Sequence, residues 1–136
     1  MKQPYILKFP QHGDKRGWLV AIEGESDVPF DIKRIFYIYG SDSTVVRGKH
    51  ANRKSEFVLI NVKGSCKVKT YDGLGSEEIF VLDEPHKGIY LPAMCWKDMY
   101  DFSEDSILLC LSSEKYDAGE YVRDFDEFCR EMRESV

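Results

Sequence analysis

Short segments that are apolar, or that alternate between apolar and polar residues, recur along this chain and are separated by turns rich in Gly, Pro, Asp and Ser. Because successive side chains of a β-strand point to opposite faces, such alternation predicts strands. We predict strands at 4–9, 18–22, 32–39, 57–62, 65–71, 78–83, 89–91 and 107–111, an extended stretch at 93–102, and a turn at 12–17. Many short strands at this spacing indicate an antiparallel sandwich or barrel.

The C-terminal segment departs from this two-residue period. Between 120 and 133 the apolar residues recur at intervals of three and four, as on one face of an α-helix. These residues are Tyr121, Val122, Phe125, Phe128, Cys129 and Met132. We therefore predict one amphipathic helix that packs on the outside of the sheets. A chain of 136 residues without a linker or repeat fits one all-β domain, 1–136, with a single C-terminal helix.

The stretch 45–62 joins a basic segment to an apolar strand. Residues 47–54 are basic and contain His50, and they continue directly into the strand predicted at 57–62. If the extended conformation is unbroken, one face of this stretch carries His50, Asn52, Lys54, Glu56, Val58, Ile60 and Val62. Lys54 is difficult to bury, so we expect a bulge or a wide mouth at its position. A face that changes from titratable to apolar predicts a ligand pocket at the mouth of a barrel. The alternative is a solvated loop that leads into an edge strand.

The composition argues against two classes of partner. With 19 Lys and Arg against 24 Asp and Glu, the net charge of −5 does not suit a protein that binds nucleic acid or a membrane surface. The 8 Tyr, 8 Phe and 2 Trp residues predict a packed or ligand-stacking interior. We therefore expect a small-molecule ligand, with neither nucleic acid nor membrane as a partner.

The cysteines indicate a reducing compartment. Cys66, Cys95, Cys110 and Cys129 are widely spaced and form no CxxC pair, so the sequence contains no zinc-knuckle or redox motif. A free thiol in an apolar segment behaves as a small core residue. The sequence also shows no basic-then-apolar leader and no apolar run near the roughly 20 residues of a membrane span. We expect a cytoplasmic protein.

A set of short motifs, in order and at matching intervals, covers almost the full chain. The motifs are RGxLVAIE at 16–23, IKRxxYI at 32–38, RGxHA at 47–51, GSC at 64–66, PAxxW at 92–96 and DFS at 101–103. Together they resemble the sugar 3,4-ketoisomerases, a branch of the cupins that acts on dTDP-4-keto-6-deoxy-glucose. The resemblance implies a homodimeric, antiparallel jelly-roll (cupin-like) barrel with the dTDP-linked 4-keto-6-deoxy sugar bound inside it.

The resemblance also implies a reaction, in which the ketone moves from carbon 4 to carbon 3 on a route to 3-amino-3,6-dideoxy sugars of surface glycans. The family motif reads Arg-Gly-x-His-x-His. His50 matches its first histidine, and Asn52 stands in place of the second. This departure leaves open whether the activity is kept, altered or lost.

Ligand chemistry argues against a metal. Metal-binding cupins gather two histidines and a glutamate from one segment and a third histidine from a later strand. The matching positions here hold His50, Asn52, Glu56 and Lys97. A charged ammonium group cannot coordinate, and an amide is a poor ligand for transition metals. We therefore expect neither a metal nor another cofactor.

Several residues are candidates for the chemistry of ketone transfer. The reaction requires a base with a pKa near neutrality, for which His50 is suited. Its enediolate intermediate requires hydrogen-bond donors or positive charge, which Arg47, Lys97 and the Tyr37 hydroxyl can supply. Arg34 and Arg47 are suited to the diphosphate or to sugar oxygens.

Further candidates for substrate binding are Asn52, Glu56, Trp18 and Trp96, the two tryptophans as covers for a base or sugar ring. Each candidate also has a structural alternative: Tyr37 as a hydrogen-bond donor within the sheet, Glu56 as an ion-pair partner of Lys54 or Arg53, Lys97 as a solvated loop charge, and both tryptophans as core residues.

Two other functions fit the same residues. The first is a non-catalytic dTDP-sugar binding module, in which Asn52 marks the loss of catalysis. The second is 3,5-epimerisation of the same substrate, which pairs the base with an opposing acid, often a tyrosine. The segment 32–39 has apolar residues on both faces, which is compatible with a partner strand in a homodimer.

Overall fold

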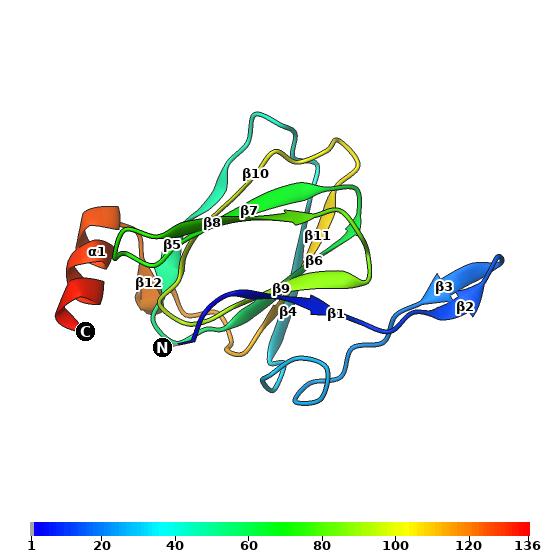
Figure 1. The fold of residues 1–136 in the computed structure, drawn as a ribbon, viewed down its shortest axis with the longest axis horizontal. Helices are drawn as coiled ribbons and strands as arrows, with labels where there is room; N and C mark the ends of the chain where they lie inside the picture. Colours follow the sequence, from blue (N-terminus) through cyan, green and yellow to red (C-terminus); the bar gives the residue numbers. More distant parts are fainter. Residues whose placement is uncertain (1) are drawn as a thin grey trace.

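The computed structural model describes residues 2–136 and contains two antiparallel five-stranded sheets packed face to face, with one helix at the C-terminal end (Figure 1). The strand order is β1-β9-β6-β11-β4 in the first sheet and β12-β5-β10-β7-β8 in the second. The chain crosses repeatedly between the two sheets, as in a jelly roll. This architecture confirms the predicted all-β antiparallel fold with one C-terminal α-helix.

Most predicted strands are confirmed, with small shifts at their ends. The strands are β1 (Tyr5–Lys8), β2 (His12–Asp14), β3 (Gly17–Leu19), β4 (Arg34–Tyr39), β5 (Arg47–Asn52), β6 (Phe57–Lys63), β7 (Cys66–Tyr71), β8 (Glu77–Leu82), β9 (Lys87–Leu91), β10 (Trp96–Tyr100), β11 (Ile107–Ser112) and β12 (Tyr121–Val122). A short 3₁₀ turn, η1 (Ala118–Glu120), precedes β12, and the helix α1 spans Phe125–Glu134. The alternating burial of β4 and β7 matches the period that predicted them.

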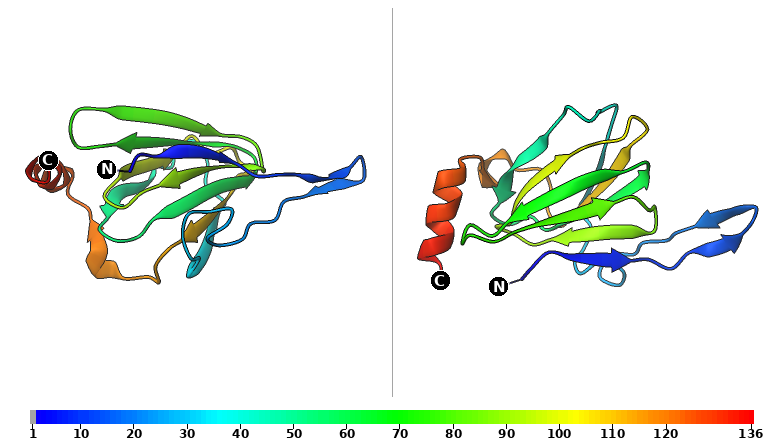
Figure 2. Two further views of the ribbon diagram at one scale, coloured as in Figure 1. Left: turned by 60° about the horizontal axis from the view of Figure 1, so that its bottom comes forward. Right: turned by 45° about the horizontal axis from the view of Figure 1, so that its top comes forward.

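The N-terminal region differs from the prediction of a turn at 12–17 followed by a strand at 18–22. Instead, β2 and β3 form a two-stranded hairpin that projects from the sheets, at the end of the molecule opposite α1 (Figures 1 and 2). The Asp14 carboxylate accepts hydrogen bonds from the backbone N–H and guanidinium of Arg16 and so closes the turn. Beyond the hairpin, Val20 and Ile22 pack on the outer face of the first sheet.

The predicted helix at 120–133 is wrong in its first turn. Tyr121–Val122 pairs with β5 as the short strand β12, and α1 begins only after Asp124. The Asp124 carboxylate accepts hydrogen bonds from the backbone N–H groups of Asp126 and Glu127, a typical N-cap. Among residues 2–136, no helix has the length and apolar character that a bilayer crossing requires.

Two apolar clusters flank the first sheet, and a third supports the helix. The cluster between the sheets includes Leu59, Val68, Leu82, Leu91 and Leu108, all buried. A second cluster covers the outer face of the first sheet, where Val28 and Phe30 pack on Val58 and Ile60. The third joins Phe128 and Met132 of α1 to Trp96 and Val122, which confirms that the helix packs outside the sheets.

Candidate active site

A cavity of about 160 Å³ lies between the sheets, beside β4 and β5. Its apolar wall is formed by Phe36, Ile38, Phe57, Leu59 and Met99, and its titratable side chains are Arg34, Arg47, His50, Lys97, Cys110 and Tyr121. Among the described residues that line it, none is an Asp or Glu. A cavity with cations and no carboxylates suits an anionic ligand with an apolar or ring-shaped part.

His50 is held in a defined orientation on β5. Its Nδ1 lies 2.7 Å from the carbonyl oxygen of Gly48, and its ring contacts the Tyr121 ring at 4.8 Å between centroids. Because a carbonyl oxygen only accepts hydrogen bonds, Nδ1 carries the proton of the neutral imidazole and Nε2 keeps its lone pair. Burial and the nearby Lys97 charge lower the pKa of His50 to about 4, so the ring is neutral at pH 7.

Gly48 brings β5 close to β10 beside His50. It has a φ of +87°, and a Cβ atom at this position would lie 2.7 Å from the carbonyl oxygen of Lys97. The pairing of β10 with β5 shifts register between Lys97 and Asp98, so Lys97 pairs with His50 and Asp98 with Gly48. A side chain larger than hydrogen does not fit at position 48 without separating the two strands.

Lys97 is buried in the cavity wall, with 3% of its surface exposed. Its Nζ donates a hydrogen bond to Asn52 Oδ1 at 2.8 Å and lies 4.6 Å from the centre of the Phe57 ring. Burial lowers the pKa of Lys97 to about 8. The alternative in which Lys97 is a solvated loop charge is therefore wrong, because β10 directs this side chain inward.

The two arginines predicted to bind substrate both reach the cavity. The Arg34 guanidinium lies over the Phe36 ring at 4.4 Å and over the Tyr116 ring at 5.1 Å. Arg47 is more exposed, at the start of β5, and its Nε lies 3.5 Å from the Ser41 hydroxyl. Both guanidinium groups therefore keep N–H donors for a ligand.

Tyr121 and Arg123 were not among the residues predicted for the site. Tyr121 lies in the cavity wall beside His50, and the Arg123 guanidinium stacks over the Tyr121 ring at 4.7 Å. Both residues were missed because the helical spacing of the apolar residues placed 120–133 in a helix outside the sheets. Asp124 followed by Asp126 and Glu127 is an N-cap signal that places residues 121–123 before the helix.

Four predicted site residues lie away from the cavity. Tyr37 points outward from β4 and is 63% exposed, because β4 directs Arg34 and Phe36 inward. Trp18 lies on the projecting hairpin and is 66% exposed. Trp96 is buried against the Phe125 and Phe128 rings of α1, which is the core role given as its alternative.

Glu56 is the fourth residue, and its position shows that the predicted continuous face of 45–62 is wrong. Glu56 accepts a hydrogen bond from the Tyr90 hydroxyl and pairs with Lys2 at 3.3 Å, so neither Lys54 nor Arg53 is its partner in the structure. The chain turns at 53–56, so Phe57 and Leu59 share the cavity with His50, while Val58 and Ile60 face outward.

Glu120 stabilises this turn from a distant part of the chain. Its carboxylate accepts hydrogen bonds from the backbone N–H groups of Lys54 and Ser55 and from the Ser55 hydroxyl. Burial raises the pKa of Glu120, but these hydrogen bonds outweigh burial and leave the pKa below its ordinary value. The turn that changes which residues face the cavity is therefore held by a side chain about 65 residues away in sequence.

The side chains at the positions that correspond to the ligands of metal-binding cupins do not suit a transition-metal ion here. Asn52 Oδ1 accepts the Lys97 hydrogen bond, and Glu56 is turned toward Tyr90. In the part of the chain from residue 2 to 136, no three His, Cys, Asp or Glu side chains converge as metal ligands would.

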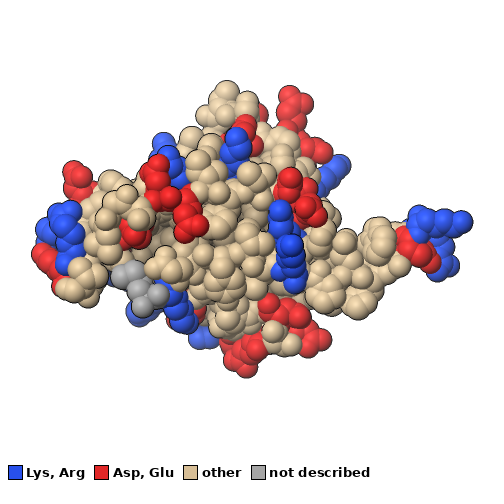
Figure 3. Space-filling view, viewed as in Figure 1, with Lys and Arg blue, Asp and Glu red and all other residues tan. Residues whose placement is uncertain are grey.

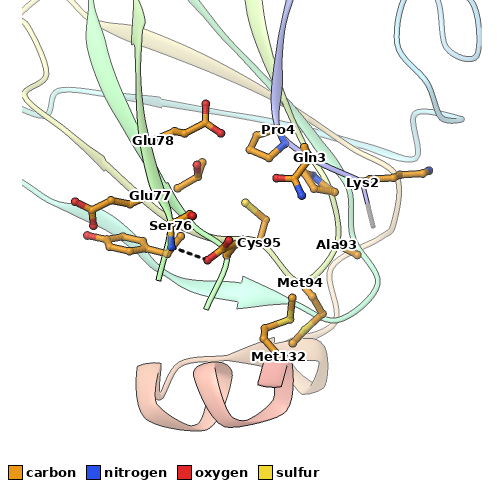
Figure 4. Close-up of a pocket in the computed structure, with 14 residues that line it drawn as sticks. Lys2, Gln3, Pro4, Ser76, Glu77, Glu78, Ala93, Met94, Cys95 and Met132 are labelled. Carbon is orange, nitrogen blue, oxygen red and sulfur yellow. Dashed lines mark hydrogen bonds between the residues drawn. The ribbon is translucent and has the colours of Figure 1, made fainter. Parts of the chain in front are cut away.

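A second hollow lies near α1 and the start of β1, and it is a poor candidate for the active site (Figure 4). Its volume is about 40 Å³. Cys95, Met94 and Met132 form its apolar part, and Asp72, Glu77, Glu78 and Lys2 are its charged residues. Burial raises the pKa of the Cys95 thiol to about 11, which leaves it unreactive at neutral pH.

The fold and the cavity define a cupin-like jelly-roll protein whose neutral imidazole faces a cation-lined, carboxylate-free pocket. The family model described as FdtA: WxcM-like, C-terminal matches residues 2–133. TDP-4-oxo-6-deoxy-alpha-D-glucose-3,4-oxoisomerase of Aneurinibacillus thermoaerophilus is 42% identical over 123 residues, which cover 90% of this chain and 88% of that protein.

Two solved structures show the same likeness over nearly the whole chain. A 3,4-ketoisomerase from Helicobacter canadensis has a TM-score of 0.93 and 38% identity, and the match covers 98% of this chain and 99% of that one. A histidine-to-asparagine mutant of the 3,4-ketoisomerase QdtA from Thermoanaerobacterium thermosaccharolyticum, in complex with TDP-4-keto-6-deoxyglucose, has a TM-score of 0.94 and 37% identity, covering 98% and 96%.

The chain belongs to the FdtA/WxcM-like family of 3,4-ketoisomerases, as its sequence motifs indicated, and it is an isomerase.

Proposed function

We propose that this chain converts TDP-4-keto-6-deoxyglucose to the TDP-linked 3-keto-6-deoxyhexose by proton transfer through an enediolate. The observation that carries the proposal is the state of His50, a neutral imidazole with a free Nε2 lone pair, held by the Gly48 carbonyl beside buried positive charge. The substrate of the QdtA complex supports the choice of sugar nucleotide.

The first step removes the carbon 3 proton of the 4-keto sugar. His50 Nε2 accepts this proton, and the electrons of the carbon–hydrogen bond form the double bond between carbons 3 and 4 as the carbonyl electrons move to oxygen 4. The Lys97 ammonium and the Arg47 guanidinium stabilise this anionic oxygen, because the apolar wall strengthens their attraction to it.

The second step returns the proton to the neighbouring carbon. The hydroxyl proton of oxygen 3 passes to oxygen 4, the electrons left on oxygen 3 form the new carbonyl at carbon 3, and carbon 4 takes the proton from the His50 imidazolium. No atom is gained or lost, which agrees with an isomerase that uses no cofactor. The 3-keto product is suited to a transaminase, as on the route to 3-amino-3,6-dideoxy sugars.

The diphosphate of the substrate adjusts the basicity of His50. A pKa of about 4 makes the free imidazole a weak base. A bound diphosphate brings negative charge close to Arg34 and Arg47 and offsets the positive charge that lowers the His50 pKa. Substrate binding therefore raises the pKa of the base toward the working pH.

The test is an incubation with TDP-4-keto-6-deoxyglucose in deuterated water, followed by proton NMR of the sugar. We expect a product with its ketone at carbon 3 and deuterium at carbon 4, and deuterium at carbon 3 of the remaining substrate. His50→Asn keeps the fold but stops exchange of the carbon 3 hydrogen, whereas His12→Asn, an exposed histidine on the hairpin, exchanges at the wild-type rate. Undiminished exchange in His50→Asn would remove His50 from the mechanism.

The same protein and sugar nucleotide also distinguish the two alternative functions, a binding module and a 3,5-epimerase. Binding of TDP, measured by a thermal-shift titration, without any product would support a sugar-nucleotide binding module instead of an enzyme. Tyr121 lies beside His50 and is the residue that an epimerase would use as the opposing acid. Product that keeps its ketone at carbon 4 and is inverted at carbons 3 and 5 would establish 3,5-epimerisation.

We also propose that the chain forms a homodimer through the outer face of β4. Ile35, Tyr37 and Tyr39 are 61%, 63% and 70% exposed, and Trp18 and Leu19 on the hairpin are 66% and 59% exposed. Such exposed apolar groups are typical of an interface. Light scattering of Tyr37→Glu tests this assignment, and a variant that stays dimeric at micromolar concentration would contradict it.

A further inference from the structure

We infer that Asn52 is a positioning residue, which holds the Lys97 ammonium in the cavity with its charge intact and its remaining N–H groups free for the oxygens of the reacting sugar. The inference rests on the proposed function. It concerns how a lysine that β10 points into the interior can remain a cation without a carboxylate partner.

The contact between the two side chains is buried and direct. Lys97 Nζ lies 2.8 Å from Asn52 Oδ1, and the two residues are 3% and 1% exposed. Among residues 2–136, no Asp or Glu oxygen lies within the 4.0 Å of an ion pair with Lys97. The amide oxygen is therefore its hydrogen-bond acceptor, and it supplies a dipole without cancelling the charge.

The orientation of Asn52 follows from this contact. An ammonium group only donates hydrogen bonds, so Oδ1 must face Lys97, and Nδ2 points elsewhere. Nδ2 is buried and has no hydrogen-bond partner among the described residues. A buried ammonium and a buried unpaired amide both oppose folding. Stability alone therefore does not account for the pair, whereas a need for positive charge at the reacting oxygens does.

The remaining N–H groups of Lys97 have a defined direction. Lys97 lines the cavity and pairs with His50 across β10 and β5. The ammonium group and the base therefore lie side by side on the same wall of the cavity. The Phe57 ring lies on another side of Nζ, at 4.6 Å. An anionic oxygen formed when His50 takes the proton would meet a cation that is already in place.

The charge of Lys97 depends on the groups around it. Those around it on the packed elements are His50 and Arg47 on β5, Arg34 on β4, Cys110 on β11, Cys95 just before β10, Glu120 on η1 and Tyr121 on β12. Burial lowers the pKa of Lys97 to about 8 and the Glu120 charge raises it only in part. The ammonium therefore loses its proton as the pH rises through about 8, and activity falls with it.

This dependence makes Asn52 testable by two substitutions with opposite effects. Asn52→Asp pairs the ammonium with a carboxylate, which raises the pKa of Lys97 by about one unit or more and neutralises the charge offered to the substrate. Asn52→Leu removes the acceptor and lowers the pKa of Lys97 by about one unit. We expect kcat at pH 7 to fall about tenfold or more in both variants. The alkaline limb of the pH profile of kcat should move to higher pH in Asn52→Asp and to lower pH in Asn52→Leu.

The experiment follows Lys97 directly, by NMR titration of protein labelled with ¹⁵N and ¹³C in its lysine side chains. The Lys97 signal is identified by its absence in Lys97→Met. The matched control is Asn61→Asp, because Asn61 is also a buried asparagine but bonds to Leu82 and Ser106. It should leave the Lys97 titration unchanged. The pH dependence of kcat is then measured on the same proteins.

The outcomes separate this inference from the proposed function. A Lys97 midpoint that is the same in Asn52→Asp and wild type, or that moves equally in Asn61→Asp, overturns the inference. The titration needs no substrate, so absence of turnover in the wild type would refute the proposed function alone. Opposite displacements of both the titration and the alkaline limb support Asn52 as a positioning residue, because a purely structural role would lower kcat without moving the limb.

Discussion

The two hollows described above lie in one sandwich and have opposite chemistry. The cavity beside β4 and β5 holds cations and an imidazole with no carboxylate among its described residues, whereas the hollow near α1 is bordered by Asp72, Glu77 and Glu78. Both have an apolar floor. The difference shows that the sheets provide concave sites in general, and that the ligand is selected by a few side chains on facing strands.

The outer surface does not show this separation of charge. On the face drawn in Figure 3, acidic and basic side chains are interspersed, including at the tip of the projecting hairpin. The charged side chains that line the cavity are all cations, whereas this face of the surface carries both signs. Because opposite charges attract more strongly in a partly buried site than in water, we expect an anionic substrate to be selected in the cavity and not on this surface.

The largest effect is expected from removing the buried charge of the cavity. Lys97→Met should lower kcat by about 10²–10³, as loss of an oxyanion-stabilising group does. Its free energy of unfolding should fall by no more than about 2 kcal/mol, because loss of the desolvated ammonium offsets part of the cost of leaving Asn52 Oδ1 without a donor. Glu78→Gln in the other hollow is the control and should keep wild-type kcat. Equal losses in the two variants would contradict the comparison.

A smaller effect is expected on the affinity for TDP. Arg47→Ala removes a charge-assisted contact to the diphosphate, and we expect about a 10- to 100-fold weaker Kd by calorimetry. Arg130→Ala, on the exposed face of α1 next to Glu134, is the matched control and should bind TDP as the wild type does. Unchanged affinity in Arg47→Ala would assign the diphosphate to another part of the chain.

The cavity should also make stability depend on pH through His50. Its pKa of about 4 in the folded chain lies below the ordinary value of 6.5, so the unfolded chain binds more protons between these values. The contribution of His50 to stability is therefore present above pH 6.5 and is lost as the pH falls through about 4. Urea unfolding between pH 7 and about 4 should show a smaller loss of free energy in His50→Asn than in the wild type.

The control for this measurement is His12→Asn, which should lose free energy with falling pH as the wild type does. The same shift predicts proton uptake when TDP binds near pH 5.5, because the diphosphate raises the His50 pKa. Calorimetry in buffers of different ionisation enthalpy measures this uptake. Binding without proton uptake would show that the diphosphate lies too far from His50 to affect it.

The smallest effect concerns the helix beside the second hollow. Asp124→Ala removes the N-cap of α1 and should lower the free energy of unfolding by about 1 kcal/mol. Because α1 contributes Met132 to that hollow and no residue to the cavity, kcat should not change. A loss of activity beyond that explained by the unfolded fraction would link the helix to the reaction.

The strands were predictable because alternation is a local property. Residues 65–71 alternate and residues 107–111 are wholly apolar, and each segment is a strand within two residues of its predicted ends. The hairpin of β2 and β3 was missed because its strands of 3 residues are too short for a period to be visible. Its turn depends on the hydrogen bonds of Asp14, which a hydrophobic pattern does not record.

The residues that line the cavity could be predicted only where a motif identified them and the strand continued without a turn. His50, Arg47, Arg34 and Lys97 were chosen by chemistry and motif, and the fold brings them to one cavity. Glu56 was placed by counting along a strand that a distant carboxylate, Glu120, breaks. Tyr37 could not be oriented in advance, because both faces of β4 mix apolar and polar residues and only the packed sheets decide between them.

Gly48 limits how this site can change. A methyl group at this position would collide with the carbonyl oxygen of Lys97. Every substitution there would therefore separate β5 from β10 and increase the distance between His50 and Lys97. Positions 52 and 97 are not restricted by the backbone in this way. New chemistry in such a cavity is therefore expected to arise by exchanging side chains around a fixed glycine, with the distance between base and cation preserved.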